Sequence, residues 1–188
     1  MSVLRLVSPT DPAVAPLLAG LGREYTELYG PDAASELNRC APTEFLPPTG
    51  AFLIATDGGI TVAGGALRHL GRGYGEIKRM WTDPCFRGRG HARRVLGELE
   101  RAAIRRGYHA VRLETGTPQT AAVALYEAAG YRRIEPYGFH ADDPRCLSFE
   151  KRLDGRDHFA AHALDRGAVA VRQMLEHHAL HARRLEAA

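Results

Sequence analysis

The residues best suited to chemistry lie in one stretch from Glu76 to Arg93, where an apolar strand pattern ends at a glycine- and arginine-rich loop and a helix pattern follows. A helix start leaves backbone N–H groups unpaired, and glycines let a ligand approach them closely. The helix dipole and the four arginines between Arg87 and Arg94 add positive charge. The stretch therefore predicts an anion site, and a pyrophosphate is its natural occupant.

The residues that follow the two glycines narrow the choice of ligand. A glycine-rich turn before a helix is often only a turn, and two glycines separated by one residue are weak evidence by themselves. No Gly-Lys-Ser or Gly-Lys-Thr follows the glycines, which excludes a Walker loop. No third glycine stands where a dinucleotide-binding fold requires it. Among phosphate sites, coenzyme A is the remaining candidate.

Two segments resemble a known family. The run Arg87-Gly88-Arg89-Gly90-His91-Ala92, preceded by a strand end of the form Met-x-Thr-x-Pro, is similar to the Arg/Gln-x-x-Gly-x-Gly/Ala signature of the GNAT superfamily of N-acetyltransferases. The segment from Ala122 to Tyr131 is similar to the family's Ala-x-x-Leu-Tyr-x-x-x-Gly-Phe segment, with Tyr131 in place of Phe. The resemblance covers residues 1–153 and is strongest between Glu76 and Tyr137.

The resemblance implies an α/β (α+β) fold with a mixed, mostly antiparallel sheet of six to seven strands, splayed between strands 4 and 5, and helices on both faces. The pantetheine arm of the acyl donor would lie in the opening. Main-chain groups of Met80, Trp81 and Thr82 would bind pantetheine and the acyl carbonyl. The loop residues implied to hold the pyrophosphate are Arg87, Gly88, Arg89, Gly90, His91, Ala92 and Arg93. Gln119 stands where the family often has an Asn that contacts the cofactor arm.

Acyl transfer to an amine needs a neutral amine, a polarised thioester and an acid for the thiolate, so direct attack is expected. Tyr126 matches the family's tyrosine that protonates the thiolate, and an unshifted pKa of about 10 would suit that role. A core aromatic residue is the alternative. Glu76 matches the position of a carboxylate base in some members; otherwise it pairs on the strand surface with Lys78 or Arg112. Glu114 is a second candidate base.

The cysteines and histidines carry weaker signals. Cys85 has no histidine placed beside it, so a buried thiol is expected. His177 and His181 have helical spacing but lack the Glu of a His-Glu-x-x-His motif, so a solvated helix face is favoured and no metal is expected. His91 is expected to contribute its backbone N–H rather than its ring.

Hydrophobic periodicity predicts the elements that position these residues. The predicted strands are 3–7, 52–56, 60–70, 75–82, 110–114, 131–134 and 146–152. The predicted helices are 14–28, 33–39, a long one from the glycine-arginine loop to Gly107, and 119–129. The first helices and the loops 39–50 and 135–145 are expected to form the substrate walls, where Glu44, Asp142 and Asp143 could attract a cationic amine.

Length and composition indicate which kind of protein the chain forms. With 188 residues, 45% of them hydrophobic and 25% charged, the chain is predicted to form one globular domain over 1–153 with a helical extension over 154–188. A net charge of +3 with dispersed arginines does not indicate nucleic-acid binding. No apolar run approaches the ~20 residues of a membrane span. Three widely spaced cysteines fit reduced thiols in a cytoplasm.

The extension carries apolar residues such as Val171, Met174 and Leu175, which a lone helix cannot bury in water. They are therefore predicted to pack on the core or on another subunit of a homodimer, unless this end is frayed. Deleting the residues after Leu153 is expected to change the oligomeric state, measured by light scattering, and to leave coenzyme A binding largely intact.

The sequence therefore predicts an enzyme that transfers an acetyl group from acetyl-CoA, its co-substrate, to a primary amine of a small molecule or protein. The alternatives are a catalytically inactive acyl-CoA-binding sensor or partner module, and a nucleotide-binding protein with no place for a pantetheine arm. Tyr126 and Glu76 favour the enzyme. The sensor would be favoured if Tyr126 pointed into the core and the amine side of the opening were closed. The identity of the amine is not encoded in a readable way.

Overall fold

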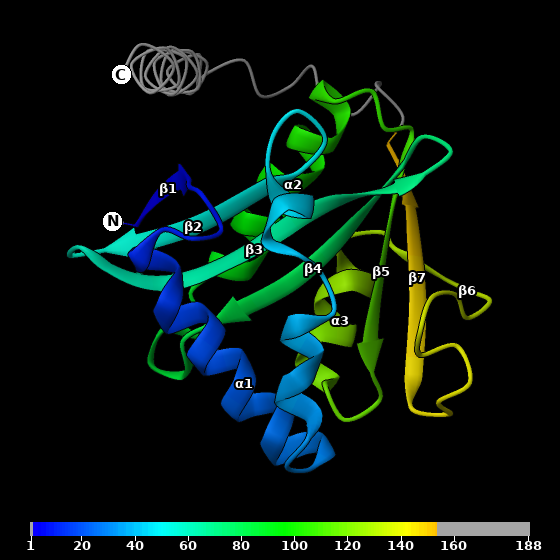
Figure 1. The fold of residues 1–188 in the computed structure, drawn as a ribbon, viewed down its shortest axis with the longest axis horizontal. Helices are drawn as coiled ribbons and strands as arrows, with labels where there is room; N and C mark the ends of the chain where they lie inside the picture. The colour runs from blue at the N-terminus through cyan, green and yellow to red at the C-terminus, as the bar shows by residue number, and fades with distance from the viewer. Residues whose placement is uncertain (1, 154–188) are drawn as a thin grey trace, which may run out of the picture. The chain divides into compact units, whose positions relative to one another are not determined.

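A computed structural model of the chain describes residues 2–153. Within them, one seven-stranded sheet has the strand order β1-β2-β3-β4-β5-β7-β6 and carries helices on both faces (Figure 1). The predicted mixed, mostly antiparallel fold is confirmed. The predicted helical extension, its histidines and its dimer contacts lie outside the described residues.

The strands lie close to the ranges predicted from the sequence, and β2 and β3 are apolar and buried over most of their length. The strands are β1 (Val3–Leu6), β2 (Ala51–Asp57), β3 (Ile60–Gly71), β4 (Tyr74–Thr82), β5 (Ala110–Gly116), β6 (Arg132–Ile134) and β7 (Cys146–Arg152). Neighbouring strands pair antiparallel except β4 and β5, which run parallel. A parallel pair needs a crossover, and the helix after the glycine-arginine loop supplies it.

Three α-helices cover the sheet, with α1 (Ala15–Tyr29) on one face and α2 (His91–Arg105) on the other (Figure 1). The third helix, α3 (Thr120–Ala128), leads into β6. Four short 3-10 helices link these elements: η1 (Pro12–Val14), η2 (Ala33–Asn38), η3 (Pro42–Phe45) and η4 (Pro84–Phe86). Within residues 2–153, no helix is both long and apolar enough to cross a bilayer.

Two buried clusters hold the layers together, one on each face of the sheet. Leu17 and Leu21 of α1 pack with Trp81 of β4, whereas Val95 and Leu99 of α2 lie in the other cluster. Both helices therefore bury the apolar stripe that the three- and four-residue spacing predicted.

The sheet opens between β4 and β5. Only the first residues of β4 pair with β5, ending at Glu76 opposite Arg112. Farther along, β4 contains a bulge, because the register against β3 shifts between Lys78 and Trp81, and Arg79 has a φ of 58°. The predicted splay between strands 4 and 5 is confirmed.

Candidate active site

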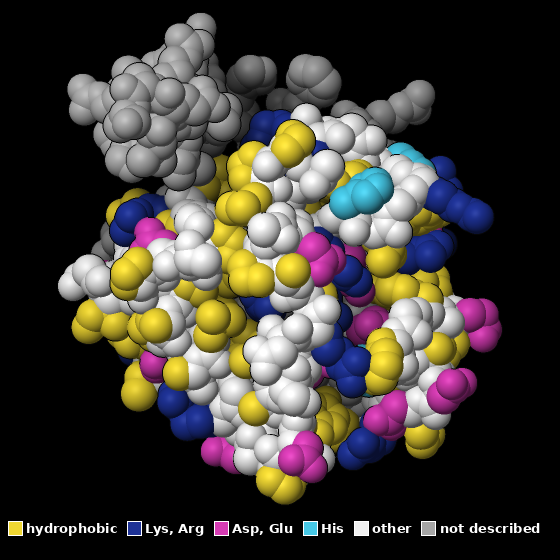
Figure 2. Space-filling view, in the orientation of Figure 1, with side chains coloured by type: hydrophobic (Ala, Val, Ile, Leu, Met, Phe, Trp, Pro, Cys, Tyr) yellow, Lys and Arg dark blue, Asp and Glu magenta, His cyan; other side chains and the backbone are white. Residues whose placement is uncertain are grey.

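A cavity of about 370 Å³ lies where β4 and β5 diverge. Its lining comes from α1, η2 and the two residues that follow Asn38, β4, β5, α3 with its preceding Gln119, and the loop before β7. All three predicted wall segments contribute to this lining: the first helices, Arg39 and Cys40 of the 39–50 loop, and the 135–145 loop. The proline-rich segment 42–50 does not line this cavity. Basic and acidic side chains meet around a hollow right of the centre of Figure 2.

The three predicted cofactor residues at the end of β4 differ in where their side chains lie. Met80 lines the cavity. The Trp81 side chain is buried with α1, where a Cβ on Gly20 would clash with the indole. The Thr82 hydroxyl is buried and has no hydrogen-bond partner in the described part of the chain. Because the indole is buried against α1, only the main-chain groups of Trp81 can contact a ligand.

The glycine-arginine loop presents a row of free amides at the start of α2. Arg94 makes the first helical hydrogen bond, to the Gly90 carbonyl at 3.1 Å, whereas the amides from Gly88 to Arg93 donate to no carbonyl among residues 2–153. Gly88 and Gly90 have φ values of 74° and 79°, a region that favours glycine. This backbone, at the positive end of a helix, fits an anion.

The side chains of this loop are partly engaged by the protein. Arg87 pairs with Glu24 of α1 at 2.8 Å. Arg89 donates to the Cys85 carbonyl at 3.1 Å, whereas the exposed Arg93 has no partner among the described residues. The buried His91 ring lies 3.1 Å from the Ser2 hydroxyl. Its ring is therefore turned inward, and its backbone N–H remains available, as expected.

The prediction of a buried Cys85 thiol is wrong, because η4 places this residue on the surface. The Asp83 carboxylate accepts the Cys85 amide at 2.9 Å and holds this single turn outward. No three His, Cys, Asp or Glu side chains within residues 2–153 form a group that could hold a metal ion.

Gln119 is oriented by three donors that all reach its side-chain oxygen. Tyr29 donates to Oε1 at 3.1 Å, the Thr115 hydroxyl at 3.0 Å and the Gly116 amide at 3.2 Å. Because Gln119 also lines the cavity, its NH2 group is the part that can donate to a ligand.

Tyr126 also lines the cavity. Its ring packs against Tyr131 and Phe149, with centroid separations of 5.8 and 6.2 Å. Its hydroxyl makes no hydrogen bond within the described structure. The expectation of an unshifted pKa is wrong: burial raises the pKa of Tyr126 because α3 presses the ring onto the sheet. The Tyr126 hydroxyl therefore stays protonated at neutral pH and can donate a hydrogen bond.

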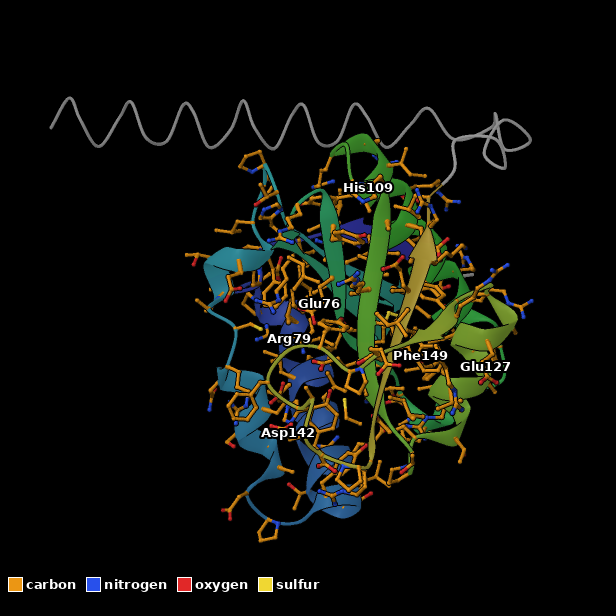
Figure 3. The ribbon with its side chains drawn as sticks, turned by 90° about the vertical axis from the view of Figure 1, so that its right-hand side faces the viewer. Glu76, Arg79, His109, Glu127, Asp142 and Phe149 are labelled. Carbon is orange, nitrogen blue, oxygen red and sulfur yellow. The ribbon has the colours of Figure 1, made fainter. Side chains whose placement is uncertain are left out.

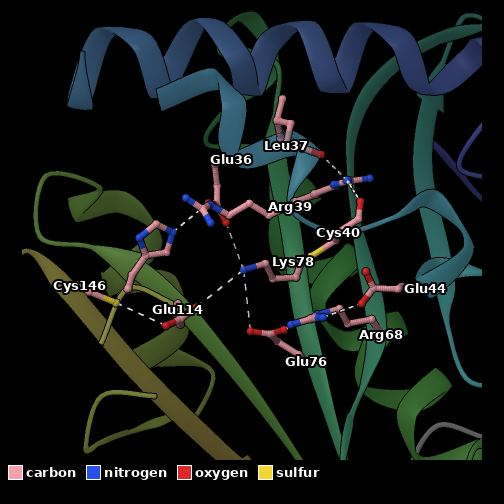
Figure 4. A network of polar contacts seen from close by, with 12 residues as sticks. Glu36, Leu37, Arg39, Cys40, Glu44, Arg68, Glu76, Lys78, Glu114 and Cys146 are labelled. Atoms are coloured by element: carbon pink, nitrogen blue, oxygen red, sulfur yellow. Dashed lines mark hydrogen bonds and ion pairs between the residues drawn. The ribbon is translucent and has the colours of Figure 1, made fainter. Parts of the chain in front are cut away.

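Glu76 lies beside the cavity rather than in its lining and is 1% exposed. Its Oε2 pairs with the Arg68 Nε at 2.5 Å, and its Oε1 accepts the Tyr137 hydroxyl at 3.2 Å. The Lys78 ammonium is 3.9 Å away, whereas Arg112 pairs with Glu150 instead. Figure 4 shows the contacts of Glu76 with Arg68 and Lys78. Both Glu76 oxygens are therefore engaged.

Glu114 faces the cavity from β5. Its Oε2 is 3.8 Å from the Lys78 Nζ, and the Cys146 thiol donates to Oε1 at 3.7 Å (Figure 4). Burial raises the pKa of Glu114, and Lys78 partly opposes that shift. Burial likewise raises the pKa of Cys146 to about 11, so this sulfur stays a thiol.

Several cavity residues were not identified from the sequence, notably Arg79, Tyr29 and His140. Tyr29 lies one residue beyond the predicted first helix, at the end of the observed α1, and its role emerges only from contact with Gln119. Strand alternation predicts that Lys78 and Arg79 point to opposite faces, but the bulge lets both contact the η2 region. In Figure 3, Arg79 and Glu76 lie near each other along β4.

Comparisons with known proteins agree with this geometry. The sequence model of the acetyltransferase (GNAT) family matches residues 16–131. The chain is 36% identical over 148 residues to the IAA acetyltransferase of Azospirillum brasilense, which covers 78% of this chain and 94% of that protein.

Solved structures show the same fold. A Klebsiella pneumoniae protein assigned to the acyl-CoA N-acyltransferases superposes with a TM-score of 0.68 at 32% identity, over 82% of this chain and 99% of that one. The Thermoplasma acidophilum PaiA N-acetyltransferase, solved with coenzyme A, has a TM-score of 0.65 at 15% identity, over 81% and 99% of the chains. At that identity the second likeness concerns the fold alone.

Proposed function

Because the chain belongs to the GNAT family of acetyltransferases and is an acyl-CoA-dependent N-acyltransferase, we propose that it transfers the acetyl group of acetyl-CoA to a primary amine by direct attack. The observation that carries this proposal is the cavity between the diverging strands β4 and β5, with Tyr126 and Gln119 in its wall. A sensor without catalysis is not favoured, since Tyr126, although its ring packs in the buried core cluster, also lines this cavity.

The donor is proposed to bind along β4 and at the start of α2. The free amides between Gly88 and Arg93 would hold the pyrophosphate, assisted by the uncommitted Arg93 guanidinium. Main-chain groups of Met80, Trp81 and Thr82 would contact pantetheine and the acyl carbonyl. The Gln119 NH2 would donate to the same arm, because its oxygen is already engaged.

The reaction then needs one attack and two proton movements. The amine nitrogen forms a bond to the acyl carbon with its lone pair, and the carbon–sulfur bond breaks with its electrons on sulfur. The Tyr126 hydroxyl donates a hydrogen bond or its proton to the departing thiolate. The acceptor nitrogen loses a proton to a carboxylate, either directly or through water.

Glu114 is better placed than Glu76 to accept that proton. Glu114 lines the cavity, and burial raises its pKa toward the range of an effective base. Both Glu76 oxygens are already bound by Arg68 and Tyr137. We therefore propose Glu114 as the base, and Glu76, predicted from the family position, as the alternative.

Substitution of the two carboxylates distinguishes them. We expect Glu114→Gln to lower kcat/KM at least about tenfold near neutral pH and to remove the acid limb of the pH profile, because the base must be ionised. Since the pKa of Glu114 is raised, that limb should lie at a higher pH than an ordinary glutamate would give. The loss should shrink at high pH, where the free amine predominates.

Glu76→Gln serves as the comparison in the same steady-state assay. It should retain the acid limb, although loss of the Arg68 pair should lower stability. If Glu76→Gln removes the limb and Glu114→Gln keeps it, the assignment is reversed.

The overall function is tested by incubating the protein with acetyl-CoA and a panel of primary amines while free thiol is measured. Amine-dependent thiol release, with the acetylated amine identified by mass spectrometry, is expected. Calorimetry that detects no binding at millimolar coenzyme A would rule out the proposal.

We propose the cytoplasm as the place of this reaction, supported by the free thiols Cys40, Cys85 and Cys146. Fractionation of cells that make the protein tests this location. The homodimer stays a prediction, to be tested by light scattering of the full chain and of a chain ending at Leu153.

A further inference from the structure

One guanidinium in the cavity wall lacks an acidic partner. Arg39 pairs with Glu36 at 2.7 Å, and Arg145 pairs with Asp143 at 2.9 Å. Lys78 lies within 3.9 Å of three carboxylates, those of Glu36, Glu76 and Glu114. Arg79 has no carboxylate within ion-pair distance among residues 2–153. The positive charge of Arg79 is therefore the one that a ligand can neutralise.

Arg79 is held by neutral groups only. Its Nη2 donates to the Leu37 and Cys40 carbonyls at 2.8 and 3.3 Å, and its guanidinium lies 4.4 Å from the centre of the Phe45 ring. Its Nε and Nη1 have no hydrogen-bond partner within the described residues. Burial lowers the pKa of this guanidinium, which nonetheless stays charged. A partly buried charge of this kind is stabilised by an anion.

The backbone fixes the position of this charge. Arg79 occupies the β4 bulge with a φ of 58°, directly before Met80, which also lines the cavity. The donor is proposed to lie along this part of β4. A ligand group bound by Arg79 would therefore lie on the acceptor side, close to the reacting carbon.

Glu114 supplies the complementary charge on the opposite strand. Glu36 and Asp143 form close ion pairs at 2.7 and 2.9 Å, and Asp32 is exposed to solvent. Among the described residues, the ion-pair contact of Glu114 is the longer one to Lys78, at 3.8 Å. The cavity thus combines one uncompensated cation on β4 with one buried acid on β5. This arrangement matches a molecule that carries both an ammonium and a carboxylate.

We infer that the acceptor is a small amino carboxylate, such as a free amino acid, whose carboxylate binds Arg79 while its amine faces Glu114. This inference rests on the proposed acetyl transfer and narrows its substrate class. A volume of about 370 Å³ has to hold the acyl end of the donor as well as the acceptor, which favours a small molecule over a protein segment.

The test compares acceptors that differ only in the carboxylate. The full chain is assayed with acetyl-CoA and the L-amino acids, their α-carboxamides and the corresponding decarboxylated amines. At least one amino acid should exceed its amide in kcat/KM. Arg79→Met should raise KM for that amino acid between about 10-fold and 100-fold, as expected for loss of hydrogen bonds between charged groups. The kcat/KM of the amide should not change.

A second variant and a control separate binding from folding. Arg79→Gly removes the guanidinium and suits the left-handed backbone, so it should behave as Arg79→Met does. Arg105→Met removes an exposed arginine that pairs with Glu98 on α2, and it should not alter the preference. Calorimetry of the preferred amino acid with coenzyme A-saturated protein should show the same loss for the Arg79 variants.

Three results would overturn the inference while leaving the acetyltransferase proposal intact. The first is equal use of amino acids and their amides, and the second is an equal effect of Arg79→Met on both. The third is acetylation of peptide or decarboxylated amines but of no amino acid. If no amine of any class is acetylated although coenzyme A binds, the proposed function itself fails.

Discussion

Replacing Gly90 by valine is expected to raise the dissociation constant of coenzyme A at least about 100-fold, because two or more charge-assisted hydrogen bonds would be lost. Gly90 has a φ of 79° at the start of α2, a backbone region that a β-branched residue rarely adopts. A Cβ there would meet no protein atom within 4 Å. Backbone strain and obstruction of the neighbouring amides should therefore cause the loss, rather than a clash in the core.

The matched control is Gly107→Val at the other end of α2. Gly107 has a φ of 77°, and a Cβ there also meets nothing within 4 Å, so the strain is comparable without obstruction of the loop. Isothermal calorimetry measures both affinities, and thermal melts with coenzyme A report the same difference by mass action. Wild-type affinity in Gly90→Val would show that coenzyme A binds elsewhere. Equal losses in the two variants would attribute the effect to α2 as a whole.

Replacing Tyr126 by phenylalanine is expected to lower kcat about 100-fold or more and to leave coenzyme A affinity unchanged, as loss of a general acid would. The ring contacts with Tyr131 and Phe149 survive this change. Because burial raises the pKa of Tyr126 above its ordinary value of 10.0, the wild-type rate should not fall near that pH through loss of this proton. Steady-state kinetics and a pH profile test both expectations.

Tyr131→Phe is the control for the Tyr126 variant. Tyr131 is buried in the same aromatic cluster but does not line the cavity, so its hydroxyl should be dispensable for turnover. If Tyr126→Phe retains the wild-type kcat, water or another group protonates the thiolate, and Tyr126 serves only as a packing residue.

The sequence by itself determined the features of this protein that depend on residues close together in the chain. Short apolar runs marked the strands, three- and four-residue spacing marked α1 and α2, and two glycines before a helix start predicted the loop whose amides are free. Tyr126 and Gln119 also followed from a contiguous resemblance, and both line the cavity. Such features are readable because neighbouring residues alone set backbone conformation and periodicity.

Only the tertiary structure decided how the cavity is charged. Glu114 and Arg79 lie on different strands, and their convergence depends on the separation of β4 from β5 after Glu76. The bulge at Arg79 breaks the two-residue alternation, so no pattern could place that side chain toward η2. The pKa of Tyr126 and the engagement of Glu76 likewise follow from burial and from partners distant in sequence, because desolvation and ion pairing depend on proximity in space.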